Sequence, residues 1–247
     1  MSILVEACVE TVASALAAER GGAGRLELCA SLCDAGTTPS AGAIAAVKAR
    51  VGIPVFVIVR PRGGGFVYSD SELDVMRRDI EAVRHMGADG IVTGVLRDDA
   101  RVDERRTRSL VDAAGGLPVT FHRAFDFIPD RASALETLIA CGVRRVLTSG
   151  GAATAVEGVG AIAELVAQSA GRIGVLAGGG IREESVQELV RRTGVAEIHV
   201  RGTRLVRSEM AAEMPPVHLR KPLPDDEGAW EETDEARIRA LTALVQR

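Results

Sequence analysis

The 247-residue sequence has few aromatic side chains, no excess of positive charge and no long apolar run. Aromatic residues make up 3% of the chain and the net charge is −4, which disfavours a protein that stacks nucleic-acid bases or neutralises phosphates. No stretch approaches the roughly 18 uncharged apolar residues of a membrane-spanning helix. The first residues include Glu6 and Glu10 and lack the basic segment of a secretory signal. We therefore expect neither a nucleic acid nor a membrane as partner.

Cysteine is also scarce. Four cysteines are too few for a disulfide scaffold of this length, and a hydrophobic fraction of 47% supplies a core without one. The same fraction excludes general disorder. We predict a cytoplasmic protein with reduced thiols.

What the chain does have is a repeat of short β-rich segments, whose starts lie 22 to 35 residues apart. They cover residues 3–7, 25–29, 55–59, 90–93, 119–122, 145–148, 173–177 and 197–200. Residues 71–86 and 132–141 between them show helical spacing of apolar residues, and several such segments end at glycine. Eight alternations of strand and helix predict a single α/β domain over residues 1–247, a (β/α)8 TIM barrel. The alternative is a doubly wound open sheet, which the regular count of eight disfavours.

The region after the eighth strand departs from this pattern. It contains Pro215, Pro216, Pro222 and Pro224, so we predict an irregular excursion over 205–230, followed by a closing helix over 231–246. The excursion is compatible with a lid, a mobile loop or a contact in a homo-oligomer.

Polar residues recur on one face of several predicted strands, because alternate side chains of a strand share a face. These faces hold Leu4, Glu6 and Cys8; Arg25, Glu27 and Cys29; Phe56, Ile58, Arg60 and Arg62; Thr120 and His122; and Glu197, His199 and Arg201. Charges inside a barrel should pair, and we expect Glu6 and Glu27 to pair with Arg60. Such a layer is either a structural network or a polar pocket with tuned pKa values.

Candidate catalytic residues lie at the strand ends, where barrels of this kind place their active sites. His122 is a candidate acid or base, Arg123 an anion holder and Asp126 an orienting carboxylate. His199 and Glu27 are further candidates at the ends of the eighth and second strands. A satisfied structural histidine is the alternative for His122 and His199.

An anionic ligand is suggested by two arginines and a glycine run. Gly178, Gly179 and Gly180 follow the seventh strand and precede a helix, where backbone amides can hold a phosphate. Arg60 and Arg62 could add charge-assisted hydrogen bonds. A run of glycines can also be no more than a tight turn.

Two cysteines end neighbouring strands. Cys8 and Cys29 end the first two strands, which lie roughly 4.8 Å apart in a barrel, and two thiolates that converge there could bind a soft cation, above all Cu(I). Cys33 lies four residues beyond Cys29 and could assist, whereas Cys141 ends an apolar helix and belongs to the core. Without a C-x-x-C motif, spacing alone makes this a weak metal signature.

The chain resembles the CutC family of copper homeostasis proteins over about residues 3–204. The stretches that carry the resemblance are VEACV, GGAGRLELC, GTTPS, IPVFVIVRPRGG, YSDSE, GADGIVTGVL, LPVTFHRAFD, RVLTSGG and GGGIR. The resemblance implies a TIM barrel, a cytoplasmic location and copper ligands at Cys8 and Cys29. Gly65 stands where the family usually has Asp, and Arg201 stands where the eighth strand usually has Ser, so the ligand preference at this mouth could differ.

Two hypotheses about function follow. The first is a copper homeostasis protein that binds Cu(I) through Cys8 and Cys29. The second is a lyase, isomerase or hydrolase that acts on a small anionic or sugar-like substrate at the barrel mouth. A role mainly in assembly is a third alternative.

Overall fold

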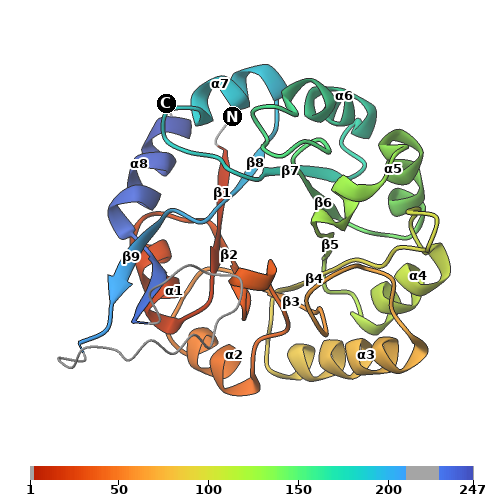
Figure 1. The fold of residues 1–247 in the computed structure, drawn as a ribbon, viewed down its shortest axis with the longest axis horizontal. Helices are drawn as coiled ribbons and strands as arrows, with labels where there is room; N and C mark the ends of the chain where they lie inside the picture. Colours follow the sequence, from red (N-terminus) through yellow and green to blue (C-terminus); the bar gives the residue numbers. More distant parts are fainter. Residues whose placement is uncertain (1–2, 210–227, 247) are drawn as a thin grey trace.

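The computed structural model describes residues 3–209 and 228–246. In these residues, eight parallel strands form a closed barrel in the order β1 to β8, and helices surround it (Figure 1). The strands are β1 (Leu4–Val9), β2 (Arg25–Leu28), β3 (Val55–Ile58), β4 (Gly90–Thr93), β5 (Val119–Phe121), β6 (Arg145–Thr148), β7 (Gly174–Gly178) and β8 (Glu197–Val200). Strands β1 and β8 pair with each other, which closes the barrel and confirms the predicted fold class.

The described α-helices are α1 (Val12–Arg20), α2 (Ala41–Lys48), α3 (Asp70–His85), α4 (Glu104–Ala113), α5 (Arg131–Ala140), α6 (Val159–Ser169), α7 (Val186–Thr193) and α8 (Glu235–Val245), with short 3-10 helices η1 (Leu32–Asp34) and η2 (Arg123–Phe127). Six of the eight described α-helices begin at a residue whose polar side chain caps the first turn, and α6 and α7 do not. At α3, Ser69 and Glu72 form a reciprocal capping box. The apolar stripe of the same helix faces the barrel through Leu73, Met76 and Ile80.

The core has two layers. The larger layer lies between the sheet and the helices, where the strands contribute residues such as Val57, Ile91 and Val146. The smaller layer fills the barrel interior and consists of Cys8, Cys29, Phe56, Ile58 and Val92. The alternation predicted for these strands therefore places the cysteines inside the barrel.

A buried ion-pair network lies at the amino ends of the strands. Arg25 is 3% exposed and donates to both Glu6 and Glu197, and Arg145 also contacts Glu197. The predicted pairing of Glu6 and Glu27 with Arg60 is wrong. The register places Arg25 directly opposite Glu6, whereas Arg60 lies beyond the end of β3.

The region after β8 is more regular at its two ends than predicted. Strands β9 (Thr203–Arg207) and β10 (Ala229–Thr233) form an antiparallel pair, although both fall partly inside the predicted irregular segment. The closing helix begins at Glu235 and not at 231, because Glu231–Thr233 pair with β9 and Asp234 caps the helix. The proline-rich part of the predicted excursion lies outside the described residues.

Candidate functional site

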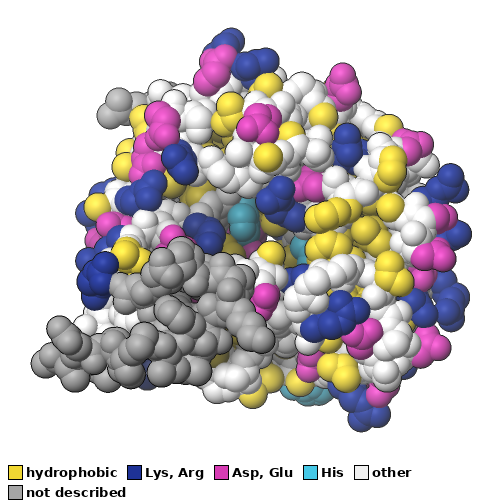
Figure 2. Space-filling model, in the orientation of Figure 1, with side chains coloured by type: hydrophobic (Ala, Val, Ile, Leu, Met, Phe, Trp, Pro, Cys, Tyr) yellow, Lys and Arg dark blue, Asp and Glu magenta, His cyan; other side chains and the backbone are white. Residues whose placement is uncertain are grey.

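A large cavity of about 1390 Å³ lies at the carboxyl ends of the strands. Figure 2 shows this face hollowed at its centre, with histidine, basic and acidic side chains around the hollow. Many candidate residues line the cavity: Cys8, Glu27, Cys29, Arg60, His122, Arg123, Gly179, Gly180, His199 and Arg201. Gly178, Arg62 and Asp126 are not among its lining residues.

The two strand-end thiols meet inside the barrel. Cys8 lies near the end of β1 and Cys29 directly follows β2, and their Sγ atoms are 3.7 Å apart. The side chains are buried and both thiols are free. This confirms the predicted convergence of the two cysteines. Cys33 is exposed and Cys141 is buried beneath α4, so neither is part of this pair.

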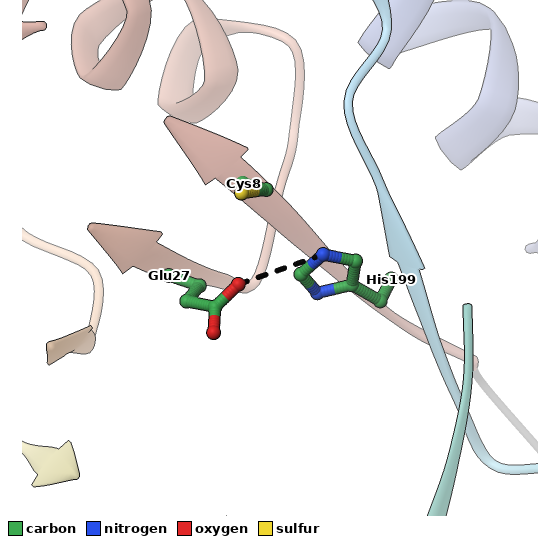
Figure 3. Close-up of side chains that lie close together, drawn as sticks. All are labelled: Cys8, Glu27 and His199. Carbon is green, nitrogen blue, oxygen red and sulfur yellow. Dashed lines mark ion pairs between the residues drawn. The ribbon is translucent and has the colours of Figure 1, made fainter. Parts of the chain in front are cut away.

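A second group of donors shares Cys8. Figure 3 shows Glu27 of β2 and His199 of β8 pointing toward each other, with Cys8 on β1, the strand between theirs. One donor atom from each of these residues lies within 4.8 Å of the other two. The Nε2 atom of His199 is 3.6 Å from Oε2 of Glu27, and its Nδ1 atom is 2.8 Å from Oε1 of Glu6.

Glu6 fixes the orientation of the His199 ring. Burial raises the pKa of Glu6, but the hydrogen bond from His199 and the charge of Arg25 outweigh it and lower the pKa to about 2. Glu6 is therefore a carboxylate at neutral pH, and it accepts the Nδ1 proton of His199. The Nε2 atom is left to face Cys8 and Glu27.

The three donors have different charges. The hydrogen bond with Cys29, helped by His199, lowers the pKa of Cys8 to about 5 against the effect of burial. Burial raises the pKa of Glu27 well above its usual value, and the Cys8 thiolate adds to this shift. Burial lowers the pKa of His199, but contacts with Cys8 and Glu6 outweigh it and raise it well above its usual value. At neutral pH Cys8 is therefore a thiolate, and the shifts of His199 and Glu27 both favour their protonated forms.

Comparison with known proteins identifies the family. The CutC family profile matches residues 3–204. The chain belongs to the CutC family. It is 45% identical to the copper homeostasis protein cutC homolog of Mus musculus over 243 residues, 98% of this chain and 89% of that one. The Homo sapiens homolog is 44% identical over the same shares.

Solved structures agree with this assignment. A CutC crystal structure from Streptococcus agalactiae has a TM-score of 0.77 and 36% identity, covering 80% of this chain and 97% of that chain. The phosphoribosylanthranilate isomerase of Pyrococcus furiosus has a TM-score of 0.58 at 13% identity over 98% of both chains, a likeness of fold alone. Within residues 3–209 and 228–246, no helix is both long and apolar enough to cross a membrane.

In this CutC family member, His122 directly follows β5, across the barrel from β1, and lines the same cavity as Cys8, Glu27 and His199. The ring is 5% exposed, and its Nδ1 atom accepts a hydrogen bond of 3.2 Å from the Ala124 backbone. Burial, with the charge of Arg60, lowers the pKa of His122 to about 3, so the ring is neutral. Phe66 packs 4.9 Å from this ring and 5.1 Å from the Arg60 guanidinium. Among the described residues, Nε2 of His122 has no hydrogen-bond partner.

Asp126 does not orient His122, contrary to the prediction. Its carboxylate accepts hydrogen bonds from Arg123, from the hydroxyl of Thr148 and from the backbone of Ser149 and Gly151. It therefore anchors Arg123 and the loop after β6. Closeness in sequence suggested the wrong partner, because η2 turns Asp126 toward the neighbouring strand β6.

Of the predicted anion-binding residues, Arg60, Gly179 and Gly180 line the cavity, whereas Arg62 and Gly178 do not. Arg60 is 3% exposed and donates to the backbone carbonyls of Asp34, Gly36 and Gly64, so it fixes the loops after β2 and β3. Arg62 points outward to Glu72. The glycine run does not open a helix directly, because residues 181–185 intervene before α7.

Sequence reasoning gave no role to two residues at the mouth. Phe66, at the end of the RPRGGGF stretch, packs against both Arg60 and His122. Arg201 is predicted on the inward face of the eighth strand but without a role, and the structure places it close enough to lower the pKa of Cys8, after the larger effects of Cys29 and His199. Its guanidinium is held 2.8 Å from Glu231 of β10.

Proposed function

We propose that this CutC family member binds Cu(I) through Cys8 and Cys29 and serves copper homeostasis in the cytoplasm. The observation that carries the proposal is the 3.7 Å distance between the two Sγ atoms. With metal–thiolate bonds of about 2.3 Å, one ion can reach two sulfur atoms up to about 4.6 Å apart. Thiolates are soft ligands that select Cu(I), and the named role of the curated relatives agrees.

The surroundings of the thiol pair suit a soft monovalent cation. Cys8 is already a thiolate, because its pKa is lowered to about 5 by the hydrogen bond with Cys29. Cys29 would lose its proton on binding, as metal-bound thiols do. The resulting bis-thiolate complex of Cu(I) carries one negative charge, and His199 and Arg201 lie beside Cys8 to balance it.

The test is an anaerobic Cu(I) competition titration of reduced protein. We expect one equivalent to bind, binding to be lost in the Cys8→Ser/Cys29→Ser variant, and binding to persist in the matched Cys33→Ser/Cys141→Ser variant. All three proteins keep the same number of residues and differ only in which thiols remain. Tight binding by Cys8→Ser/Cys29→Ser would contradict the proposal.

A second candidate function is an enzyme for a small anionic or sugar-like substrate. His122 favours it, because a neutral, buried imidazole with an unpaired Nε2 lies beside the positive charge of Arg60 in a cavity of substrate size. Arg123 and Gly179 lie on the same wall and would contact an anion there. The test is a thermal-shift screen of phosphates and sugar acids, in which ligands should raise the melting temperature of the wild type. The absence of any shift would count against this function.

A further inference from the structure

Cys8 belongs to a second donor set that does not include Cys29. The members of this set are Cys8, Glu27 and His199, whose donor atoms lie within 4.8 Å of one another. They come from three adjacent strands, because β1 lies between β2 and β8 in the barrel. The register places Cys8 directly opposite Glu27, and His199 opposite Glu6, two residues earlier on β1. The strand pairing therefore brings one sulfur, one nitrogen and one oxygen donor together.

This mixture of donors suits a different metal from the thiol pair. Zn²⁺ is a borderline cation that binds cysteine sulfur, histidine nitrogen and carboxylate oxygen, usually as a tetrahedron. For bonds of about 2.1 Å, two light ligand atoms of a tetrahedral zinc lie about 3.4 Å apart. The 3.6 Å between Nε2 of His199 and Oε2 of Glu27 is close to that spacing.

The outer contacts also fit a metal-bound histidine. Such a histidine usually donates its second ring N–H to a carboxylate, which fixes the ring and raises its basicity. Here Nδ1 of His199 donates to Glu6 over 2.8 Å, and Arg25 in turn holds Glu6. Glu6 and Arg25 are 1% and 3% exposed, so water does not compete for these contacts.

We propose that Cys8, Glu27 and His199 form a site for a divalent cation of the zinc type, with its fourth position open to the cavity. All three side chains line that cavity. Three protein ligands and one open position are the arrangement of catalytic zinc sites, in contrast to the four protein ligands of structural sites. A small anionic or hydroxyl-bearing ligand in the cavity could take the open position.

This site goes beyond the Cu(I) function and shares only Cys8 with it. The test is a Zn²⁺ titration of reduced, metal-free protein against a chromophoric chelator. We expect one equivalent in the wild type and affinity at least about 100-fold weaker in both Glu27→Gln and His199→Gln, because loss of an outer-shell partner alone costs about 10- to 100-fold. His85→Gln is the matched control, since His85 lies exposed at the end of α3.

Cys29→Ser separates the two metal functions. We expect this variant to lose tight Cu(I) binding and to keep Zn²⁺ affinity within about threefold of the wild type, because Cys29 is not in the donor set. Unchanged zinc affinity in Glu27→Gln or His199→Gln would overturn the zinc site. So would loss of zinc binding in a folded Cys29→Ser protein. Failure of Cu(I) binding alone would overturn only the copper proposal.

Co²⁺ provides a second readout that does not depend on the histidine and glutamate variants folding. Co²⁺ takes the place of zinc in such sites, and a thiolate ligand gives a charge-transfer absorption band. We expect the band in the wild type and in Cys29→Ser, and its absence in Cys8→Ser. A band that persists in Cys8→Ser would place the cation elsewhere and overturn the site.

Discussion

The Glu6→Gln substitution tests whether the buried carboxylate holds the barrel interior together. Glu6 is 1% exposed and contacts both Arg25 and His199, so the amide would leave a buried arginine with only part of its countercharge. The pKa of Glu6 is lowered from 4.5 to about 2, largely by these two partners working against burial. A lowering of the pKa by this much corresponds to about 3 kcal/mol of stability at pH 7.

The lowered pKa of Glu6 also predicts the direction in which the free energy of unfolding changes with pH. Because the folded-state pKa of Glu6 is lowered, its contribution is fully present above pH 4.5 and is lost as the pH falls through about 2. The advantage of the wild type over Glu6→Gln should therefore fall from about 3 kcal/mol at pH 7 to about 1 kcal/mol at pH 3. Equilibrium urea unfolding at both values of pH measures it.

A surface carboxylate provides the control for this experiment. The pKa of Glu136 is also lowered to about 2, mainly by its hydrogen bond from Arg172, but both side chains are close to half exposed. Solvent and salt screen such a pair, so Glu136→Gln should cost much less, and its cost should shrink in high salt. Equal costs for the two substitutions, or a Glu6→Gln cost that does not change between pH 7 and pH 3, would refute the reasoning.

Three further predictions concern the barrel interior. The pKa of Cys8 is lowered to about 5, by Cys29 above all, so the rate at which iodoacetamide alkylates Cys8 should rise through pH 5 and level off by pH 7. Peptide mass spectrometry measures this rate, and a rate that rises only above pH 8 would contradict the prediction. The ring resonances of His122 should stay constant from pH 7 to pH 5 in NMR spectra, because burial and Arg60 lower its pKa to about 3; titration near pH 6.5 would contradict it. Gly90→Ala should lower the free energy of unfolding by about 1–3 kcal/mol, because the added Cβ would lie 2.5 Å from the Phe56 ring; an unchanged urea midpoint would show that the ring can move aside.

The sequence predicted those features that depend on alternation along one strand. Eight regularly spaced segments predicted the barrel, and the position of Cys8 and Cys29 at neighbouring strand ends predicted that their thiols meet. Both inferences need only the period of a strand and the order of strands in a barrel. The family match over residues 3–204 supports the same fold.

Features that depend on register or on distant partners were not predictable in this way. Arg25 and Arg60 both lie on inward faces, and only the pairing of β1 with β2 shows that Arg25 meets Glu6. Strand β9 pairs with β10, which lies some twenty residues further along the chain. No short hairpin turn joins the two strands, so the sequence beside them did not indicate that they pair. Asp126 is four residues from His122 but bonds to the next strand.

The register of β1 and β2 also disfavours a disulfide between Cys8 and Cys29. Cys8 lies opposite Glu27, so Cys29 is displaced from it by two residues along the neighbouring strand. With strands about 4.8 Å apart and a rise of about 3.3 Å per residue, the two Cα atoms are about 8 Å apart. A disulfide needs Cα atoms within about 7 Å, so these sulfur atoms can share an ion but cannot bond to each other unless a strand shifts. Strand register thus separates the capture of a shared ion from the formation of a disulfide.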